Sequence, residues 1–170
     1  MANIVWSGAK NDSENIGMSN GLTDVFINVL VLSGSIIART AEEKRLIVWL
    51  AEKDQSKVGM GTVGFDVCEM PWNWETFEEN RAFLLNVIEA AKNKAGWELL
   101  DYTPNEELLF PCLDKFMQLI SKIGTDNIKP EVLKEWLEAA NPADPVLTDF
   151  PKCPKHGTLL SCFGCQICNN

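Results

Sequence analysis

The sequence predicts a mainly α-helical protein with about five helices in one domain, at most a short strand or hairpin, and a small C-terminal zinc-knuckle tail. The 170 residues are 46% hydrophobic and 23% charged, which is typical of a soluble globular domain with a sizeable core. Helical periodicity and capping signals recur along the chain, and its only histidine lies among clustered cysteines near the end. We therefore divide the chain into an irregular N-terminal arm, a helical body, a proline-containing connector and a Cys/His metal-binding tail, at positions 1–21, 22–141, 142–152 and 153–170.

Two helices are predicted after the N-terminal arm, which is polar and rich in Asn, Ser and Gly. Residues 24–38 form the most apolar stretch and predict a buried helix, although a strand pair would use the same residues. This stretch is too short to cross a membrane, which takes about 20 residues. Thr40 and Glu43 have the spacing of a capping box, so the second helix begins there and runs to about Asp54.

The middle of the chain predicts one strand and one long helix. Residues 62–68 are the best strand candidate, since they are short and rich in β-branched residues, but an extended loop fits them equally well. From Asn73 onward, apolar side chains recur at helical spacing, and Gly96 is a natural end for this helix.

Two more helices complete the predicted body. Residues 103–106 form a second capping box with a proline in the first turn, where its missing amide costs nothing. Pro111 should kink or restart this helix, which then continues to Gly124. Pro130 opens the last helix, whose apolar side chains face inward and which ends at Asn141.

The tail contains the motif that carries chemistry. Cys153 and His156 are separated by two residues, as are Cys165 and Cys168. This spacing lets each loop curl so that two ligands converge on one ion, and four N/S donors suit a closed tetrahedral zinc site. Cys162 could replace Cys153 or His156 as a ligand. We therefore expect a structural Zn²⁺ held by Cys153, His156, Cys165 and Cys168.

The first half of the motif, positions 153–157, reads Cys-Pro-Lys-His-Gly and resembles the knuckles of zinc-ribbon proteins, whose usual form is Cys-Pro-x-Cys-Gly. His156 stands where the second cysteine of such a knuckle would be. The resemblance implies a metal knuckle and says nothing about the helical body. Disulfides in an exported protein, redox-active thiols and an iron–sulfur cluster are the alternatives, the last of which leaves His156 unused. The N-terminus shows no secretory signal, so we expect a cytoplasmic protein, in which clustered cysteines favour metal.

The sequence gives little support for an enzyme. The signatures of zinc deaminases, zinc proteases, P-loop enzymes and serine hydrolases are absent. With His156 committed to a metal, no other histidine could act as a general base, which excludes Ser–His–Asp and Cys–His catalysis. Any catalysis would therefore rest on carboxylates or thiols.

Residues 64–74 are the most unusual segment of the body, because carboxylates, a thiol and two tryptophans lie between a predicted strand and a long helix. The aromatic residues could simply anchor this loop to the core, or they could contact a partner, since tryptophan is frequent at the centre of interfaces. A catalytic loop is the third interpretation. The candidate partner-binding residues of this loop and of the following helix are Asp66, Glu69, Trp72, Trp74, Glu75, Glu78 and Glu79.

The charge pattern suggests a function. The net charge of −9 disfavours nucleic acid as a partner, because phosphate contacts need clustered Lys and Arg, and it favours a basic protein. We expect a non-enzymatic, acidic protein-binding module, similar in size and charge to antitoxin or immunity proteins that inhibit basic partners. A small metal-dependent or carboxylate enzyme with its site near residues 64–74 is the alternative. A subunit of a larger assembly, whose tail lysines contact RNA or DNA, is the third hypothesis.

Overall fold

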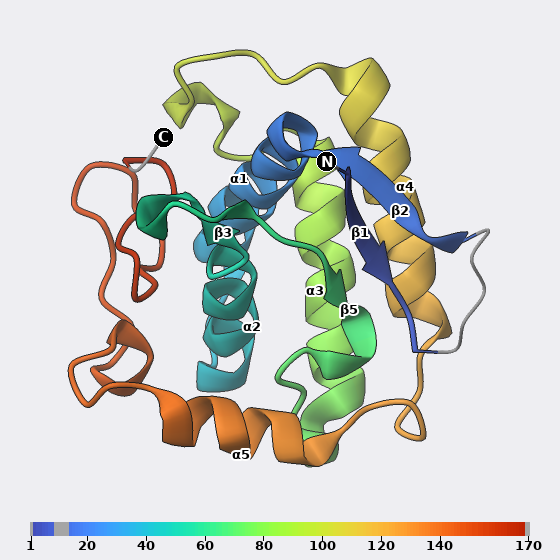
Figure 1. Cartoon of the computed structure of the whole chain (residues 1–170), viewed down its shortest axis with the longest axis vertical. Helices are drawn as coiled ribbons and strands as arrows, with labels where there is room; N and C mark the ends of the chain where they lie inside the picture. Colours follow the sequence, from blue (N-terminus) through green and yellow to red (C-terminus); the bar gives the residue numbers. More distant parts are fainter. Residues whose placement is uncertain (1, 9–13, 169–170) are drawn as a thin grey trace.

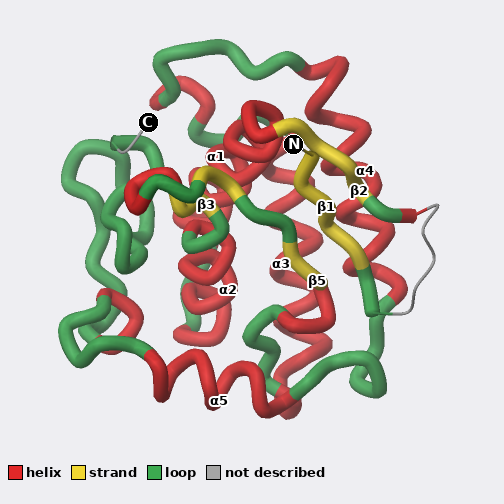
Figure 2. The backbone as a smooth tube through the Cα atoms, in the orientation of Figure 1, coloured by secondary structure: helices red, strands yellow, loops and turns green. Residues whose placement is uncertain are grey.

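The computed structural model describes residues 2–8 and 14–168 and confirms a mainly helical protein (Figure 1). Helices pack side by side behind a small sheet, and the C-terminal tail lies along one flank as loops and turns (Figure 2). The α-helices of the described residues are α1 (Asn20–Ile37), α2 (Ala41–Ala51), α3 (Phe77–Lys92), α4 (Glu106–Lys122) and α5 (Pro130–Ala139).

Helix α1 is the centre of the fold and contacts α2, α3 and α4. It is apolar around most of its circumference, as a helix covered on several sides must be. The helix predicted at 24–38 is confirmed, but it begins earlier, because the Ser19 hydroxyl accepts a hydrogen bond from the backbone N–H of Leu22 and caps the first turn. By length and composition α1 could cross a membrane, yet 61% of its 18 residues are buried inside the fold.

The predicted irregular arm at 1–21 instead contains two strands and the start of α1 among its described residues, while positions 1 and 9–13 of that prediction lie outside the described residues. Strand β1 (Ala2–Trp6) pairs antiparallel with β2 (Ile16–Ser19) and parallel with β5 (Phe65–Asp66), which forms a three-stranded sheet. Ile16 and Met18 point into the core while the residues between and after them are exposed. The alternation of buried and exposed residues in β2 spans only four residues, and β5 is distant in sequence. The local pattern was therefore too weak to predict these strands.

The strand predicted at 62–68 is divided among several elements. A two-stranded ribbon joins β3 (Asp54–Gln55) to β4 (Gly61–Thr62), and β5 then adds to the main sheet. The chain next turns through the 3-10 helix η3 (Val67–Glu69). Gly64 lies so close to β1 that a Cβ atom built on it would be 2.0 Å from the carbonyl oxygen of Ile4. Only glycine therefore fits this position without a backbone shift.

Some of the helices begin at the capping residues that the sequence predicts, and others do not. The capping box of Thr40 and Glu43 is present at the start of α2. Asn73 caps a short 3-10 turn, η4 (Trp74–Thr76), and α3 begins after it. The capping box predicted at 103–106 is wrong, because the Asn105 side chain caps α4 instead. Pro111 lies inside α4, which continues as one helix to Lys122.

The tail shares the core of the body. After α5, which runs across one end of α2 and α3 (Figure 1), the chain passes the 3-10 turn η6 (Pro145–Leu147) and folds back along α1 and α2. Leu159 is fully buried and belongs to the main hydrophobic cluster. The side chains of α5 are half-buried or exposed, so Trp136 covers the core without entering it. The tail is therefore a packed part of the fold.

Candidate metal centre

The four predicted ligands meet at one point. The Sγ atoms of Cys153, Cys165 and Cys168 and a ring nitrogen of His156 all lie within 4.8 Å of one another, in a group that could hold a metal ion. His156 Nδ1 is 3.7, 3.5 and 3.3 Å from the three sulfurs in that order, and the Cys153 and Cys168 sulfurs are 3.7 Å apart. A tetrahedral site with ordinary zinc bond lengths has about 3.8 Å between sulfurs and about 3.6 Å between sulfur and nitrogen. The side chains are thus spaced as metal ligands.

The first knuckle is held by backbone hydrogen bonds around Cys153. The N–H of Cys153 donates to the carbonyl of Thr158 at 2.9 Å, and the N–H of Gly157 donates to the carbonyl of Cys153 at 2.8 Å. Gly157 has φ +69°, a left-handed conformation that glycine adopts without strain. This closes the loop, so that Cys153 and His156 point the same way.

The second knuckle directs backbone N–H groups at a sulfur. The N–H groups of Ile167 and Cys168 both lie 3.3 Å from Cys165 Sγ, and the Thr158 hydroxyl lies 3.0 Å from it. These contacts fix the position of the Cys165 sulfur within the second knuckle. Burial opposes ionisation of Cys153, but the backbone N–H groups of His156 and Lys155 prevail and lower its pKa to about 6. Cys168 differs, because its side-chain hydrogen bond with Cys153, followed by burial, raises its pKa to about 11.

Cys162 lies outside this cluster. Its thiol donates a hydrogen bond to Glu52 Oε1 at 3.5 Å, and Asp144 completes this second group. Burial and then the charge of Glu52 raise the pKa of Cys162 to about 12. Cys162 therefore does not take the place of Cys153 or His156 in the structure. The cysteines are free thiols, and the separation of 3.7 Å between the Cys153 and Cys168 sulfurs is far longer than the roughly 2.05 Å of a disulfide.

A buried polar network fixes the cluster of candidate ligands to the body. Gln166, between two of the ligands, donates to Asn28 Oδ1 at 2.9 Å and to Asp54 Oδ2 at 2.7 Å. Asn28, in the middle of α1, donates in turn to the Tyr102 hydroxyl at 2.8 Å. Burial, followed by the hydrogen-bonded Asp54 carboxylate, raises the pKa of Asp24 to about 6. Sequence reasoning missed this network, although an asparagine within the most apolar helix was a usable signal.

The tail is attached to the body at a second place, through Ser35 near the end of α1. Its hydroxyl accepts a hydrogen bond from the backbone N–H of Leu159 at 2.9 Å, and its carbonyl accepts one from Lys152 Nζ at 3.1 Å. Ser35 and Leu159 are both buried. Because buried polar groups need partners, these bonds fix where the tail lies on α1.

We expect Gln166→Ala to lower the free energy of unfolding by about 1–3 kcal/mol, because it removes two hydrogen bonds to buried groups. Urea unfolding of the full chain measures this loss. Gln118→Ala is the matched control, since Gln118 is exposed on α4 and its loss should have almost no effect. Equal stability of the two variants would show that the network does not fasten the tail.

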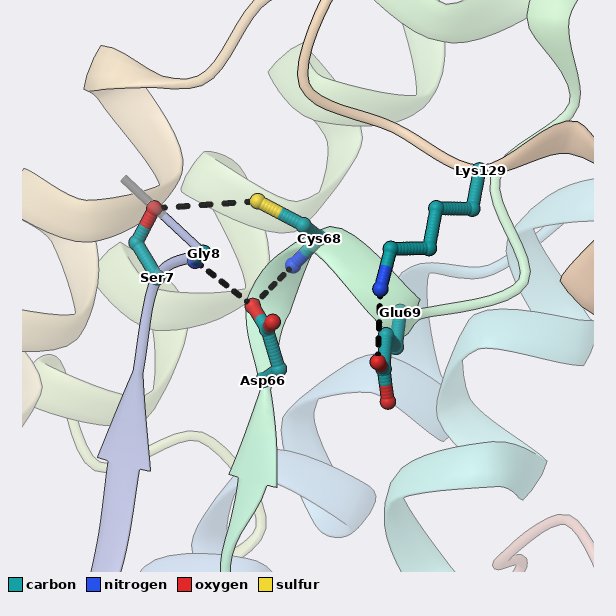
Figure 3. Close-up of polar contacts among 6 residues, drawn as sticks. All are labelled: Ser7, Gly8, Asp66, Cys68, Glu69 and Lys129. Carbon is teal, nitrogen blue, oxygen red and sulfur yellow. Dashed lines mark hydrogen bonds and ion pairs between the residues drawn. The ribbon is translucent and has the colours of Figure 1, made fainter. Parts of the chain in front are cut away.

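Two of the predicted partner-binding residues are structural instead (Figure 3). Asp66 is buried, and its Oδ1 accepts hydrogen bonds from the N–H groups of Gly8 and Cys68 at 3.0 and 2.9 Å. Trp72 is 1% exposed and donates from Nε1 to the carbonyl of Val67 at 2.8 Å. Both side chains are buried and hold the loop to the core, which for Trp72 is the first of the interpretations given for the aromatic residues of this segment.

The remaining candidates lie on the surface. Glu69 is exposed and forms an ion pair with Lys129 at 2.8 Å (Figure 3). Trp74 is 50% exposed, a large value for tryptophan. It is followed by three exposed carboxylates, of which one forms an ion pair with Arg81; the three are Glu75, Glu78 and Glu79.

Among the described residues, two groups could hold a metal ion: the four-residue group that contains Cys153, and the group of Glu52, Asp144 and Cys162. The four-residue group is held by two knuckles and is fixed to α1 through buried hydrogen bonds. Three sulfurs and one imidazole nitrogen could bind a metal ion without any further protein ligand. Comparison with models of protein families, with curated proteins and with solved structures finds no match for this chain.

Proposed function

We propose that this protein is a non-enzymatic binding module, completed by a structural Zn²⁺ ion, that recognises a basic protein partner in a reducing cytoplasm. The observation that carries the zinc assignment is the convergence of Cys153, Cys165, Cys168 and His156 at tetrahedral spacing. Thiolate and imidazole donors suit zinc better than magnesium or calcium, which bind oxygen. An iron–sulfur cluster on four cysteines would need Cys162, which lies with Glu52 instead.

A structural role for the zinc ion follows from its donor set. Four side chains fill a tetrahedral coordination shell, whereas a catalytic zinc keeps one position open for water or substrate. The region of 64–74 gives the enzyme hypothesis no support either. The Asp66 carboxylate accepts two backbone hydrogen bonds and Glu69 is paired with Lys129, so both candidate acids already have partners.

The proposed partner surface consists of Trp74, Glu75, Glu78 and Glu79, which we call the acidic patch. It combines a half-exposed tryptophan with one carboxylate in η4 and two in the first turn of α3. Tryptophan is a frequent anchor at the centre of protein interfaces, and carboxylates around it attract Lys and Arg of a partner. Arg81 neutralises Glu78, so Glu75 and Glu79 carry most of the uncompensated charge.

We expect the double variant Glu75→Gln/Glu79→Gln to slow association with the partner about tenfold at low salt, because charges at an interface steer encounter. Trp74→Ala should instead speed dissociation. The tagged full chain is used to isolate partners from lysate of the source cell at low and high salt, and association rates are then measured on the purified complex. Glu131→Gln/Glu135→Gln on α5 is the charge-matched control. A complex that forms equally fast with all variants would contradict the assignment of this surface.

A further inference from the structure

A pocket of about 250 Å³ adjoins the metal centre. It is formed where the two knuckles face α1, the end of the 3-10 helix η5 (Trp97–Leu99) and the residues that follow η5. Pockets for drug-sized molecules have volumes of roughly 300–1,000 Å³, so this one suits a smaller ligand. Because both knuckles contribute to its wall, the pocket depends on the metal centre being folded.

Two opposite charges line this pocket without pairing. Lys155, from the first knuckle, and Asp101, from the segment after η5, are both exposed at its wall. Across the described residues, neither forms an ion pair, although ion pairs are common elsewhere on this surface. A ligand with a negative and a positive group would complement both charges at once.

Two further donors are available at the same wall. His156 directs Nδ1 at the three sulfurs, so a metal bound there leaves Nε2 to carry the proton and donate a hydrogen bond. The Tyr102 oxygen accepts a hydrogen bond from Asn28, which leaves its own hydrogen free to donate. Together with Lys155 they form a set of donors that suits a carboxylate group.

Besides Asn28 and Cys168, the remaining wall is formed by aliphatic side chains. Leu99 is 37% exposed and Tyr102 is 36% exposed, and half-buried Leu100 and Ile167 lie beside them in the pocket. A ligand with an aliphatic body would cover these side chains and remove their apolar surface from water.

We propose that this pocket binds a small zwitterion with an aliphatic body, the chemistry of an apolar amino acid. Its carboxylate lies against Lys155 and His156, its ammonium group against Asp101, and its side chain against Leu99 and Ile167. The donor role of His156 rests on the proposed zinc site. Since the ligand requires both knuckles in place, ligand and metal stabilise each other, and by thermodynamic linkage each raises the affinity of the other by the same factor.

Calorimetric titration of the full chain with L-leucine tests this proposal, with the zinc content of each sample measured in parallel. We expect saturable binding of L-leucine, and at least about tenfold weaker binding of 4-methylpentanoate and of 3-methylbutylamine, which each lack one of the two charges. Lys155→Met and Asp101→Asn should weaken L-leucine binding to a similar degree. Lys134→Met, which removes an exposed lysine on α5, is the control and should bind as the unmodified protein does.

A second readout is the release of zinc to a chelator, which L-leucine should slow in the unmodified protein and leave unchanged in Asp101→Asn. Zinc-loaded protein that shows no saturable binding of L-leucine, or that binds 3-methylbutylamine equally well, would overturn the pocket assignment. Protein that binds L-leucine but contains no zinc would support the pocket, and it would refute the zinc site together with the donor role of His156 and the linkage between ligand and metal. The two proposals can therefore fail separately.

Discussion

Replacing Cys165 by serine is expected to remove the metal ion and to lower the free energy of unfolding by about 3–5 kcal/mol, because the binding energy of a structural metal is part of the folding energy. Cys165 is buried and receives two backbone N–H groups and the Thr158 hydroxyl. Its loss disorganises the second knuckle, which also carries Gln166. The helices should keep their far-ultraviolet dichroism, since most of the core lies among α1, α2, α3 and α4.

Cys162→Ser is the matched control for this experiment, because it changes a thiol of the same tail that lies outside the four-ligand group. It should keep one metal ion per chain and change the stability little. Elemental analysis measures the metal content of both variants, and urea unfolding measures their free energies of unfolding. Purified unmodified protein without metal, with all four cluster side chains chemically free, would contradict the metal site, as would equal stability of the two variants.

The helices could be predicted because their signals are local. The Thr40–Glu43 capping box and the apolar stripe of α3 each lie within a few turns of chain, and both are present in the structure. The sheet could not be predicted in the same way. Strand β1 (Ala2–Trp6) gains its parallel partner from β5, which is far away in the sequence, and β5 has only two residues. Such pairing depends on the tertiary fold rather than on local propensity.

The candidate site, like the fold, could be predicted from the sequence where its residues are close together in the chain. The four candidate ligands could be predicted because each pair is separated by two residues, a spacing that brings two side chains together within one turn of chain. Their attachment to Asn28 and Asp54 depends on residues far apart in sequence and was not predictable. The sequence left two interpretations open for Trp72, because a tryptophan that anchors a loop to the core and one that anchors a partner look alike in a sequence; the structure shows it buried.

Replacing Gly64 by alanine is the second change with a large expected effect. A Cβ atom at this position would lie 2.0 Å from the carbonyl oxygen and 2.8 Å from the nitrogen of Ile4, so the backbone of β1 or β5 has to move. We expect a loss of about 3 kcal/mol or more in the free energy of unfolding, at or above the upper end for overpacking, because a backbone cannot rotate away as a side chain can. Urea unfolding measures this loss.

Gly17→Ala tests whether close approach, rather than the loss of any glycine from the sheet, is the cause. Gly17 lies in β2 opposite Ile4, and a Cβ atom there would meet nothing within 4 Å. Its replacement should be neutral or slightly stabilising, because alanine reduces the conformational entropy of the unfolded chain. The two variants change the same residue type on either side of the same strand. Equal stability would therefore mean that β5 does not lie against β1 as described.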